Sequence, residues 1–555
     1  VALAVAAGLG GWWAARGFAG RTPMAPAFLR LSFQRGVLGN ARFGPDGQTV
    51  VYGFNPALLR GVTQLFLTRP PSPESKPFEF MGDILSIARS GDLAIFQQTG
   101  ASAEGTLAVA PMVGGTPRRL VENVLWAGAD WDPNGKGLAV VRMVGGTGRL
   151  EFPIGRVLVP RAVEGLRFSA DGREIAFWET EIAFWETESG DSRLSVIDRD
   201  GKNKAAFSSG WFRSSGSPCW SADGREIWFT AWKAGETDSL WAARRSGEVR
   251  RVARVPGSLE LYDVSRDGRV LMAHHTIVWP LRGLAPGQST EVDLSWLDRS
   301  SPSDLSSDGT TLLITEDGEG AGNAPVVYTR TTDGAPATRI GEGEAVALSP
   351  DNQWVLATRK DRGRKRFWLL PTGPGDAKPL SLEGLDAGWG AFLPGGRQIV
   401  FAAASGADGP SRLYVADVGG GKPRPFTPEG VHLQPFASPV SPDGRRVVGV
   451  RKGQFLIYRI DGPGEPQVVA GFSPPLDRLV QWSSDSRSLF AYNQTTRPIQ
   501  VDLIDVETGE KRPWRQIPVD ETWRQVRVRV TPSGNAYVFG ATSIISELYL
   551  VEGLR

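Results

Sequence analysis

Cysteine and histidine are nearly absent from this chain: its 555 residues include one Cys and three His. A single cysteine cannot form a disulfide within the chain, and so few ligands cannot build a zinc site of Cys and His or an iron–sulfur cluster. Net charge is also lacking, because 62 Lys and Arg balance 60 Asp and Glu to a formal +2. Without an excess of positive charge, the chain has no global attraction for nucleic acid. We therefore expect no cofactor, no metal site and no nucleic-acid partner.

Catalytic motifs are missing as well. The sequence contains no G-x-S-x-G nucleophile elbow, no Walker A loop and no H-E-x-x-H motif. His274 and His275 are neighbours on a predicted strand, where successive side chains face opposite ways, so they are poorly placed to share one substrate. Cys219 precedes Trp220 in a predicted inner strand and is expected to be a buried, inert thiol. We predict that the chain is not an enzyme.

The first fifteen residues, VALAVAAGLGGWWAA, are apolar and precede the first charge at Arg16. As a helix they span about 22 Å, less than the ~30 Å hydrocarbon core of a bilayer, so a transmembrane helix would need residues upstream of Val1. Trp12 and Trp13 suit the aromatic belt of a membrane interface. We predict a truncated membrane anchor in residues 1–20 that contacts the membrane through residues 1–15. The apolar region of a secretory signal peptide is the alternative.

One phrase recurs twelve times along the rest of the chain: an apolar run, a small polar turn built on Pro-Asp-Gly, and a second apolar run. Asp-Gly between two alternating apolar runs predicts a β-hairpin, because glycine reaches the positive φ of a tight turn. The equivalent turn residues are Gly47, Gly91, Gly135, Gly172, Gly224, Gly268, Gly309, Asn352, Gly396, Gly444, Ser486 and Gly534. Their eleven steps average about 44 residues.

A second hairpin follows each copy, as in RLYVADVGGGKPRPFT at residues 412–427. Two hairpins in about 44 residues are four antiparallel strands, which is the period of a β-propeller blade. Propellers close with about four to eight blades, so twelve copies are too many for one ring. We predict an all-β fold with two tandem six-bladed β-propellers; seven plus five blades is the alternative.

The two ends of the repeat array complete each other. The last copy ends in SELYLVEGLR, which has the form of a third strand without a fourth, whereas residues 28–36 have the form of a fourth strand without a third. We expect Leu29–Phe33 to pair with the C-terminal blade and close the last ring, which removes two open strand edges. The predicted domains are the anchor at 1–20, a first propeller at 21–295 and a second at 296–555.

A tandem duplication interrupts the fourth copy. EIAFWET at residues 174–180 is repeated directly at 181–187. An insertion of seven residues would turn the next strand inside out if it stayed in register, because side chains on a strand alternate with period two. We expect one of the two copies to be extruded from the sheet.

Aromatic residues supply the candidate site. Several of the 19 Trp lie just before a predicted first strand, in the connections that gather around the mouth of a propeller channel. Exposed aromatic side chains there would form a recognition surface for a protein or a small-molecule ligand. The alternative is that they fill the space between blades. The candidate recognition residues are Trp126, Trp211, Trp389, His432, Phe436 and Trp523.

Several phrases resemble a known family: ARFGPDGQTVVYG, ADWDPNGKGLAVVR, WSADGREIWFTA, RLYVADVGGGKPRPFTPEG and the ending ELYLVEGLR. They resemble the TolB-type, WD-repeat-like propeller at the C-terminal end of bacterial membrane-anchored serine/threonine protein kinases, over residues 28–555. Asn352 and Ser486 depart from the glycine of the family turn. The resemblance implies a cytoplasmic kinase domain upstream and a single-pass anchor in the bacterial inner membrane, with the propellers in the periplasm. The kinase signatures themselves are absent from this chain.

The predicted function is therefore a non-catalytic extracytoplasmic sensor or protein-interaction module of such a kinase. One alternative is a periplasmic TolB-like scaffold that is released from a signal peptide. A prolyl-oligopeptidase-type propeller is a further alternative, disfavoured because the sequence ends without a hydrolase domain.

Overall fold

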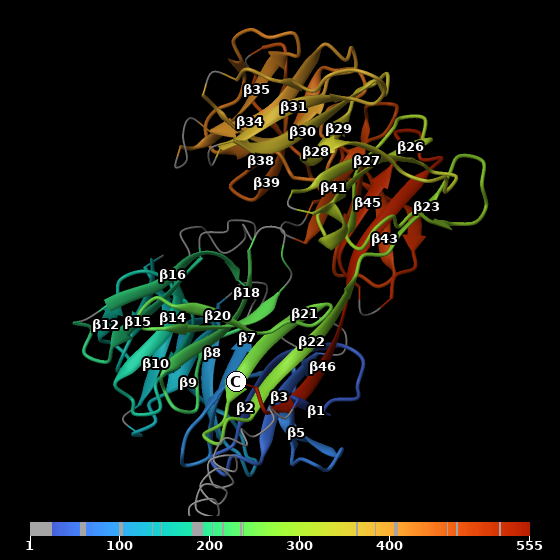
Figure 1. The fold of residues 1–555 in the computed structure, drawn as a ribbon. Coiled ribbons are helices and arrows are strands. Elements are labelled where there is room, and N and C mark those ends of the chain that lie inside the picture. The colour runs from blue at the N-terminus through green and yellow to red at the C-terminus, as the bar shows by residue number, and fades with distance from the viewer. Residues whose placement is uncertain are drawn as a thin grey trace, which may run out of the picture.

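The fold is given by a computed structural model that describes residues 25–55, 63–98, 104–135, 137–145, 147–179, 192–202, 204–213, 216–233, 236, 238–322, 324–361, 364–382, 384–404, 409–462, 464–472, 476–520 and 523–554. Within these ranges the regular structure is β-strand, apart from one turn of 3₁₀ helix, η1 (Glu319–Ala321). The strands form two lobes (Figure 1). The predicted all-β fold is confirmed.

The first lobe, the lower one in Figure 1, is built from the strands up to Val278, and the second lobe from those that follow. The strands of the first lobe are β1 (Ala27–Arg30), β2 (Val37–Phe43), β3 (Val50–Asn55), β4 (Gln64–Thr68), β5 (Ser75–Met81), β6 (Asp83–Ile87), β7 (Asp92–Gln98), β8 (Glu104–Pro111), β9 (Arg118–Trp131), β10 (Leu138–Val144), β11 (Thr147–Glu151), β12 (Val157–Val159), β13 (Glu164–Phe168), β14 (Glu174–Glu179), β15 (Ser192–Asp198), β16 (Lys204–Arg213), β17 (Cys219–Trp220), β18 (Glu226–Trp232), β19 (Ser239–Arg244), β20 (Val249–Ala253), β21 (Ser258–Val264) and β22 (Val270–Val278).

The strands that follow are β23 (Leu281–Leu284), β24 (Val292–Asp293), β25 (Ser300–Leu305), β26 (Thr311–Glu316), β27 (Val326–Thr331), β28 (Thr338–Glu342), β29 (Glu344–Leu348), β30 (Trp354–Asp361), β31 (Arg364–Pro371), β32 (Lys378–Pro379), β33 (Asp386–Phe392), β34 (Gln398–Ala404), β35 (Ser411–Asp417), β36 (Arg424–Pro425), β37 (Val431–His432), β38 (Arg446–Arg451), β39 (Gln454–Arg459), β40 (Gln467–Val468), β41 (Asp477–Trp482), β42 (Ser488–Asn493), β43 (Ile499–Asp505), β44 (Lys511–Ile517), β45 (Trp523–Val530) and β46 (Tyr537–Glu552).

Antiparallel units of four strands recur through both lobes, as the sequence period predicts. The sheet β2-β3-β4-β5 is one such unit, and β25-β26-β27-β28 is another. Some units are fused: the long strand β9 pairs with β8 at one end and with β10 at the other, and so belongs to two units. Four-stranded antiparallel units that pack face to face around an axis are the architecture of a β-propeller.

The Asp-Gly turns have a repeated internal structure, which explains why Ser and Asp accompany the glycine. In the copy SADG, Gly224 has φ 67° and its N–H donates to the carbonyl of Ser221 at 2.8 Å. The Asp223 carboxylate accepts the N–H of Arg225 at 3.0 Å, and the Ser221 hydroxyl accepts that of Glu226 at 3.0 Å. The side chains therefore satisfy the backbone donors that a two-strand turn leaves open.

Two copies lack the turn glycine and keep the turn. Asn352 and Ser486 have φ values of 57° and 56°, the same left-handed region as the glycines. Left-handed backbone is costly for a residue with a Cβ, less so for Asn than for Ser. The departures from the family phrase thus change the local backbone energy and leave the hairpin intact.

Hydrophobic clusters join each unit to its neighbours. Val51 of β3 and Ile84 of β6 share one cluster between the first two units. The packing of the first lobe closes on itself, because Tyr52 of β3 and Tyr262 of β21 share another. In the second lobe, Leu312 of β26 packs with Leu281 of β23. Each lobe is therefore a closed cycle of packed sheets.

The last strand, β46, connects the lobes. Its first residues, Tyr537–Gly540, pair with β23 on one side and β45 on the other. Its later residues, from Ser543 to Val551, pair with β22. In Figure 1 this strand runs from the upper lobe into the lower one beside β22. One 16-residue strand therefore belongs to sheets of both lobes.

The predicted pairing of the two ends is confirmed, but the ring that it closes differs. Leu29 of β1 lies opposite Leu550 of β46, as expected. The sheet that they complete is that of β21 and β22 in the first lobe, not the last unit of the array. The reason is the length of β46: after its residues in the second lobe, it continues straight into the first. Strand pairing changes lobes at residues 279–280, whereas the domains expected from the sequence meet between residues 295 and 296.

The duplicated segment is described only in part. The first copy forms β14, which pairs in continuous register with β15 and, across an irregularity in β13, with β13. The second copy lies outside the described residues, so the predicted extrusion stays a prediction.

Candidate functional site

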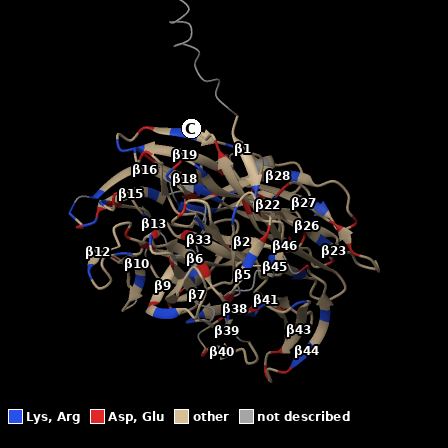
Figure 2. Ribbon diagram, turned by 90° about the horizontal axis from the view of Figure 1, so that it is seen from below, with Lys and Arg blue, Asp and Glu red and all other residues tan. Residues whose placement is uncertain are grey.

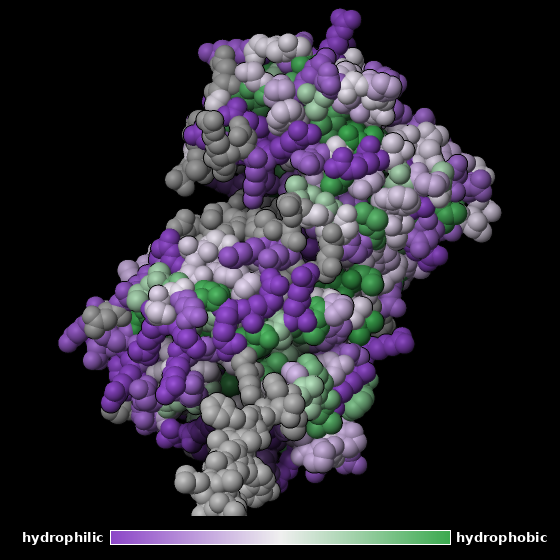
Figure 3. All heavy atoms as spheres, in the orientation of Figure 1, coloured by the Kyte–Doolittle hydropathy of each residue, from purple (hydrophilic) through white to green (hydrophobic). Residues whose placement is uncertain are grey.

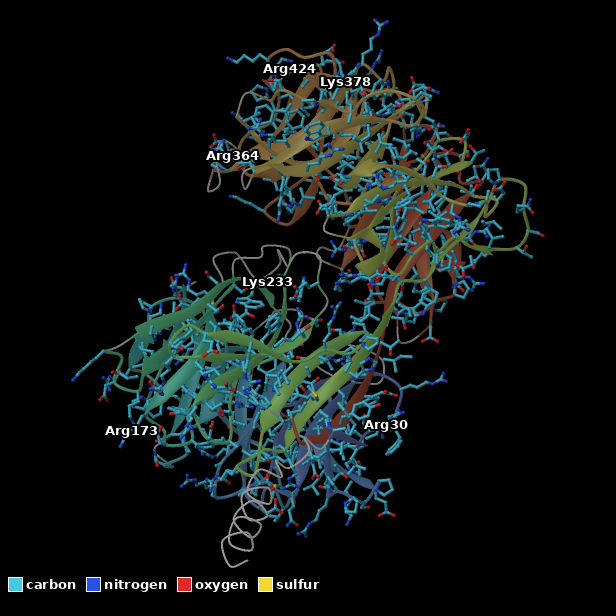
Figure 4. All side chains as sticks on the ribbon, viewed as in Figure 1. Arg30, Arg173, Lys233, Arg364, Lys378 and Arg424 are labelled. Carbon is cyan, nitrogen blue, oxygen red and sulfur yellow. The ribbon has the colours of Figure 1, made fainter. Side chains whose placement is uncertain are left out.

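Trp211 is a core residue. Its side chain is 1 % exposed, and its ring packs against Phe229 and Trp241. The indole N–H donates to the hydroxyl of Ser208 at 2.5 Å. Lys233, on the side of the first lobe that faces the second (Figure 4), lies over the ring at 4.5 Å from its centroid. Trp211 therefore fills space in the core, as in the alternative stated above for these aromatic residues. Its buried ring cannot form part of a recognition surface.

Trp126 lies apart from the other candidates and is tied to a buried carboxylate. Its indole N–H donates to Asp83 at 3.1 Å. The Asp83 carboxylate occupies space left by two glycines, since a Cβ on Gly39 or Gly53 would lie 1.9 or 2.5 Å from its Oδ1. Burial raises the pKa of Asp83 to about 6; the Trp126 hydrogen bond opposes this shift and the charge of Glu260 adds to it.

Trp389 and Phe436 come together in the second lobe. Their ring centroids are 5.0 Å apart, and the indole N–H of Trp389 donates to the carbonyl of Ala437 at 3.2 Å. The guanidinium of Arg527 lies 3.6 Å from the centroid of the Phe436 ring, a cation–π contact. Phe436 itself has φ 59°, which is strained for an aromatic residue. The sequence analysis named both aromatic residues as candidates but predicted neither their contact nor the part played by Arg527, which has the character of an ordinary strand residue.

The two remaining candidates stand separately. The Trp523 ring packs 6.1 Å from that of Phe539, and its carbonyl accepts a hydrogen bond from Arg497 at 3.0 Å. His432 lies on the short strand β37 opposite Val450, with an exposed side chain.

A set of residues that the sequence analysis missed surrounds the axis of each lobe. They share one position, five residues before the turn residue of each copy, which we call the channel position. In the first lobe it holds Arg42, Ser86, Asp130, Arg167, Cys219 and Asp263; in the second it holds Asp304, Ala347, Ala391, Pro439, Gln481 and Arg529. The fixed offset from the turns was the signal that could have found them.

The channel positions of the first lobe form an ionic plug. Arg167 donates to Asp130 at 3.0 Å, and Arg42 donates to the carbonyl of Tyr262 at 2.7 Å and to that of Leu85 at 2.7 Å. These contacts join neighbouring units, whereas Arg167 also reaches units that are not its neighbours, through the carbonyls of Leu85 at 3.4 Å and Tyr262 at 3.3 Å. Although burial disfavours its charge, Asp130 and a second carboxylate hold the pKa of Arg167 above its usual range.

Three aspartates at the channel position each link their own unit to the next one. Asp130 accepts the backbone N–H of Phe168 at 2.8 Å, and Asp263 accepts that of Phe43 at 3.0 Å. In the second lobe, Asp304 accepts the N–H of Leu348 at 2.9 Å. In each case the donor lies one residue after the channel position of the next unit, so the carboxylate fixes the angle between neighbouring sheets.

The second lobe fills its channel with backbone. Small side chains stand at several of its channel positions, and the segment 434–439 crosses the axis. Arg529 donates to the carbonyl of Phe436 and to that of Ser303, the latter at 2.7 Å. Ser438 contacts the Asp304 carboxylate at 3.5 Å, although their units are not neighbours. Burial lowers the pKa of Arg529 to about 10 and raises that of Asp304.

A Ser–His–Glu chain is present but closed to substrate. The two ring nitrogens of His275 lie 2.8 Å from the Ser546 hydroxyl and 2.9 Å from the Glu260 carboxylate. All three side chains are buried, and they join β22, β46 and β21. His274, on the other face of the strand, contacts the carbonyl of Pro256 at 2.8 Å. The Ser–His–Glu chain therefore holds the inter-lobe strand in place.

Cys219 matches its expected character. Its thiol is buried among channel residues, and burial raises its pKa to about 11. A thiol with a raised pKa is a poor nucleophile at neutral pH.

Surface features add little to these sites. In the view of Figure 2, basic and acidic residues are intermixed along the described strands. A hollow of about 620 Å³ lies beside the first-lobe turns and the C-terminal strand, lined by residues that include Gln48, Asp267, Arg269 and Glu552. Among the described residues, no cluster of His, Cys, Asp and Glu could hold a metal ion. The same part of the chain contains no helix long and apolar enough to span a bilayer, and the predicted anchor at 1–20 lies outside it.

No protein-family profile matches the chain, and no curated protein matches it either. Solved structures do match at low identity. The tricorn protease is 13% identical, with 92% of this chain and 57% of that chain covered and a TM-score of 0.33. A putative TolB from Agrobacterium tumefaciens is also 13% identical, over 64% of this chain and 98% of that chain, with a TM-score of 0.28. The chain thus spans a little over half of the tricorn protease chain.

Proposed function

We propose that this chain is a non-catalytic extracytoplasmic interaction module that recognises its partner at the channel mouth of the second lobe. The observation that carries the proposal is the group formed by Trp389, Phe436 and Arg527. An aromatic ring held at positive φ, flanked by a second ring and covered by a guanidinium, combines the residue types that dominate binding hot spots. Backbone strain of this kind gathers at functional sites.

The architecture that presents this group is, in our proposal, a pair of six-bladed propellers. The first ring would comprise five units from β2 to β20 and a sixth made of β21, β22, the C-terminal half of β46, and β1. The second would comprise five units from β25 to β44 and a sixth made of β45, the N-terminal half of β46, β23 and β24. Closed hydrophobic packing in each lobe supports this division.

The partner chemistry follows from the group. Two aromatic rings and a guanidinium favour a protein segment with an apolar or aromatic side chain flanked by an acidic one. A small-molecule ligand of the same character would satisfy the same groups. The intermixed surface charges offer no support for a nucleic acid.

A photo-crosslinking experiment tests the recognition site. A benzophenone amino acid replaces the exposed Pro435, beside Phe436, in the full chain, and crosslinked partners from the native host are identified by mass spectrometry. Proline has no backbone N–H, so its replacement breaks no hydrogen bond of the main chain. We expect a partner whose crosslink disappears in Trp389→Ala.

The matched control for this experiment is Trp354→Ala. Trp354 packs in the same lobe as Trp389 but directly follows a turn, at the opposite end of its sheet. Its removal should cost packing without changing the crosslink. A crosslink that neither substitution changes would contradict the proposal.

The parent protein is a separate question with a direct test. We propose the membrane-anchored kinase as parent on the family phrases and the apolar start, and the secreted TolB-like scaffold as the alternative. The coding sequence upstream of Val1 decides between them: a kinase domain supports the first, and a short basic leader with a start Met supports the second.

A further inference from the structure

Three segments lie side by side where the chain passes between the lobes. On β45 and β46, Arg524 stands directly opposite Thr542 in the antiparallel register. On the other side of β46 lies the link at residues 279–280, since the N–H of Ala541 donates to the carbonyl of Pro280 at 3.1 Å. Arg524 and Thr542 therefore share one face of this sheet, and Trp279 belongs to the adjoining segment.

That face looks toward the unit of β25 in the second lobe. A Cβ on Gly540, two residues before Thr542 and so on the same face, would lie 2.8 Å from Pro302 of β25. Arg299, next to β25, places its guanidinium 5.3 Å from the centroid of the Trp279 ring. Arg299, Trp279, Thr542 and Arg524 thus meet at one interface.

Each of these four side chains has a buried polar atom that finds no hydrogen-bond partner among the described residues: Arg524 Nε, Thr542 Oγ1, Trp279 Nε1 and Arg299 Nε. All four atoms can donate a hydrogen bond. Native structures leave few buried polar groups unpaired, and each unpaired group is costly. Arg299 Nε makes only an ion-pair contact with Asp317 Oδ1 at 3.6 Å, too long for a hydrogen bond, and the other three atoms have no partner among the described residues. Four donors at one interface that lack a hydrogen bond therefore indicate a shared acceptor.

The balance of charge points the same way. In the described part of the chain Arg524 makes no ion pair, and burial lowers its pKa to about 10. Arg299 lies 3.6 Å from Asp317, whose own pKa is raised by burial despite the charges of Arg299 and Arg527. Asp298 is also close to Asp317 but accepts the N–H of Gly320 at 3.2 Å. Neither carboxylate raises the pKa of Arg524, so its charge is not balanced by them.

We propose that Arg524, Thr542, Trp279 and Arg299 bind a small oxyanion at the junction between the lobes. A carboxylate or a phosphate group offers several acceptor atoms to guanidinium, hydroxyl and indole donors at once. The site is reachable, because the Arg299 side chain is 44 % exposed.

The neighbouring surface suggests what could carry the anion. Ile277 and Val278, at the end of β22, are 37 % and 48 % exposed. Apolar side chains cover this part of the surface where β22 and β46 pass between the lobes (Figure 3). The oxyanion is therefore either a free ion or the acidic side chain of a peptide that also covers these two residues. Because residues 279–280 and β46 both pass through the site, binding of the anion would stabilise the junction between the lobes.

Thermal unfolding of the full chain tests the site in sodium chloride and in sodium phosphate at equal ionic strength. Phosphate should raise the unfolding midpoint of the wild type, and both Arg524→Gln and Thr542→Val should lose this response. The apparent affinity for phosphate should fall by about tenfold or more in Arg524→Gln, as expected for the loss of a charge-assisted hydrogen bond. Arg512→Gln, at an exposed arginine paired with Glu510, is the control that should respond like the wild type.

A second readout separates an anion site from an ordinary structural arginine. In chloride, Arg524→Gln should leave the midpoint unchanged or raise it, because it removes a buried charge without a counter-ion. Thr542→Val, which preserves the shape of the side chain, should do the same. A marked loss of stability in chloride for both variants would show that protein or solvent already pairs these groups, and would overturn the proposal.

Calorimetric titration with inorganic phosphate and with an acetylated tetraglutamate peptide distinguishes the two sources. Binding of phosphate alone identifies a free-ion site, and tighter binding of the peptide identifies an acidic segment as the ligand; each should be lost in Thr542→Val. Binding of neither probe would overturn the proposal without affecting the crosslink from position 435, and so without affecting the proposed function.

Discussion

The two lobes are built from the same kind of hairpin turn and the same four-stranded units, yet they fill their channels by different means. In the first lobe, long charged side chains from the channel position contact each other and the main-chain carbonyls of other units. In the second lobe, small residues such as Ala347 and Ala391 leave space, and the backbone around Phe436 enters it. The charged groups of the first plug are directed at one another and at main-chain carbonyls. A plug of backbone brings an aromatic side chain to the mouth, which is why we place recognition in the second lobe.

Breaking the ionic plug should have the largest effect. Asp130→Ala leaves the Arg167 charge and the Phe168 N–H without their acceptor, so we expect a loss of about 3–5 kcal/mol in the free energy of unfolding. Urea unfolding followed by tryptophan fluorescence measures it. Replacing both partners, as Asp130→Leu with Arg167→Met, should recover most of this loss, because it leaves no unpaired buried charge. A double variant as unstable as the single one would mean that the ion pair is not what holds the units.

The stability of the protein should depend on pH through Asp83 of the first lobe. Its pKa of about 6 in the folded protein lies above its ordinary value of 3.8, so the native state binds a proton more tightly than the unfolded chain. Stability should therefore fall as pH rises from about 4 to 6, by roughly 2–3 kcal/mol, and stay lower above that range. Asp83→Asn keeps an acceptor for Trp126 and should flatten this part of the pH profile. An unchanged profile would assign the dependence to other groups.

Much of this comparison could be predicted from the sequence, and the rest fails for identifiable reasons. The turn period fixes the hairpins, because Asp-Gly between apolar runs encodes local geometry. The pairing of Leu29 with the C-terminal strand was also predictable, because each end lacked one strand. The lobe in which this pairing occurs was not predictable, since nothing local in the 16 residues of β46 marks where one sheet ends and the next begins.

The candidate site divides in the same way. Trp389 and Phe436 could be predicted from their places before a first strand. Trp211 occupies a similar place in the sequence but is buried. Its burial could not be predicted, because the sequence does not reveal whether a neighbouring unit leaves room for the ring. Arg527 was missed because its role depends on the cross-unit contact with Phe436.

Releasing the backbone plug of the second lobe should cost less than breaking the ionic one. Arg529→Met frees the carbonyls of Ser303 and Phe436, for which we expect about 1–2 kcal/mol, partly offset because burial already disfavours the charge. The larger consequence should be local: the Trp389 environment changes, and the crosslink from position 435 weakens. Comparison of the Trp fluorescence spectrum with that of Arg167→Met is the check. Equal spectral changes in both variants would remove the distinction between the two plugs.

The smallest expected effect lies in the turns, and it too separates the lobes. All six turn residues of the first lobe are glycine, whereas the second lobe places Asn352 and Ser486 at the same left-handed position. Ser486→Gly should raise the free energy of unfolding by about 0.5–1 kcal/mol, because it removes the Cβ from a backbone with φ 56°. Asn352→Gly should gain less, since Asn tolerates this conformation, and Gly224→Ala should lose a similar amount in the first lobe. Urea midpoints of the three variants measure the series; a gain from Asn352→Gly that exceeds that from Ser486→Gly would mean that side-chain contacts, not backbone strain, set the difference between the turns.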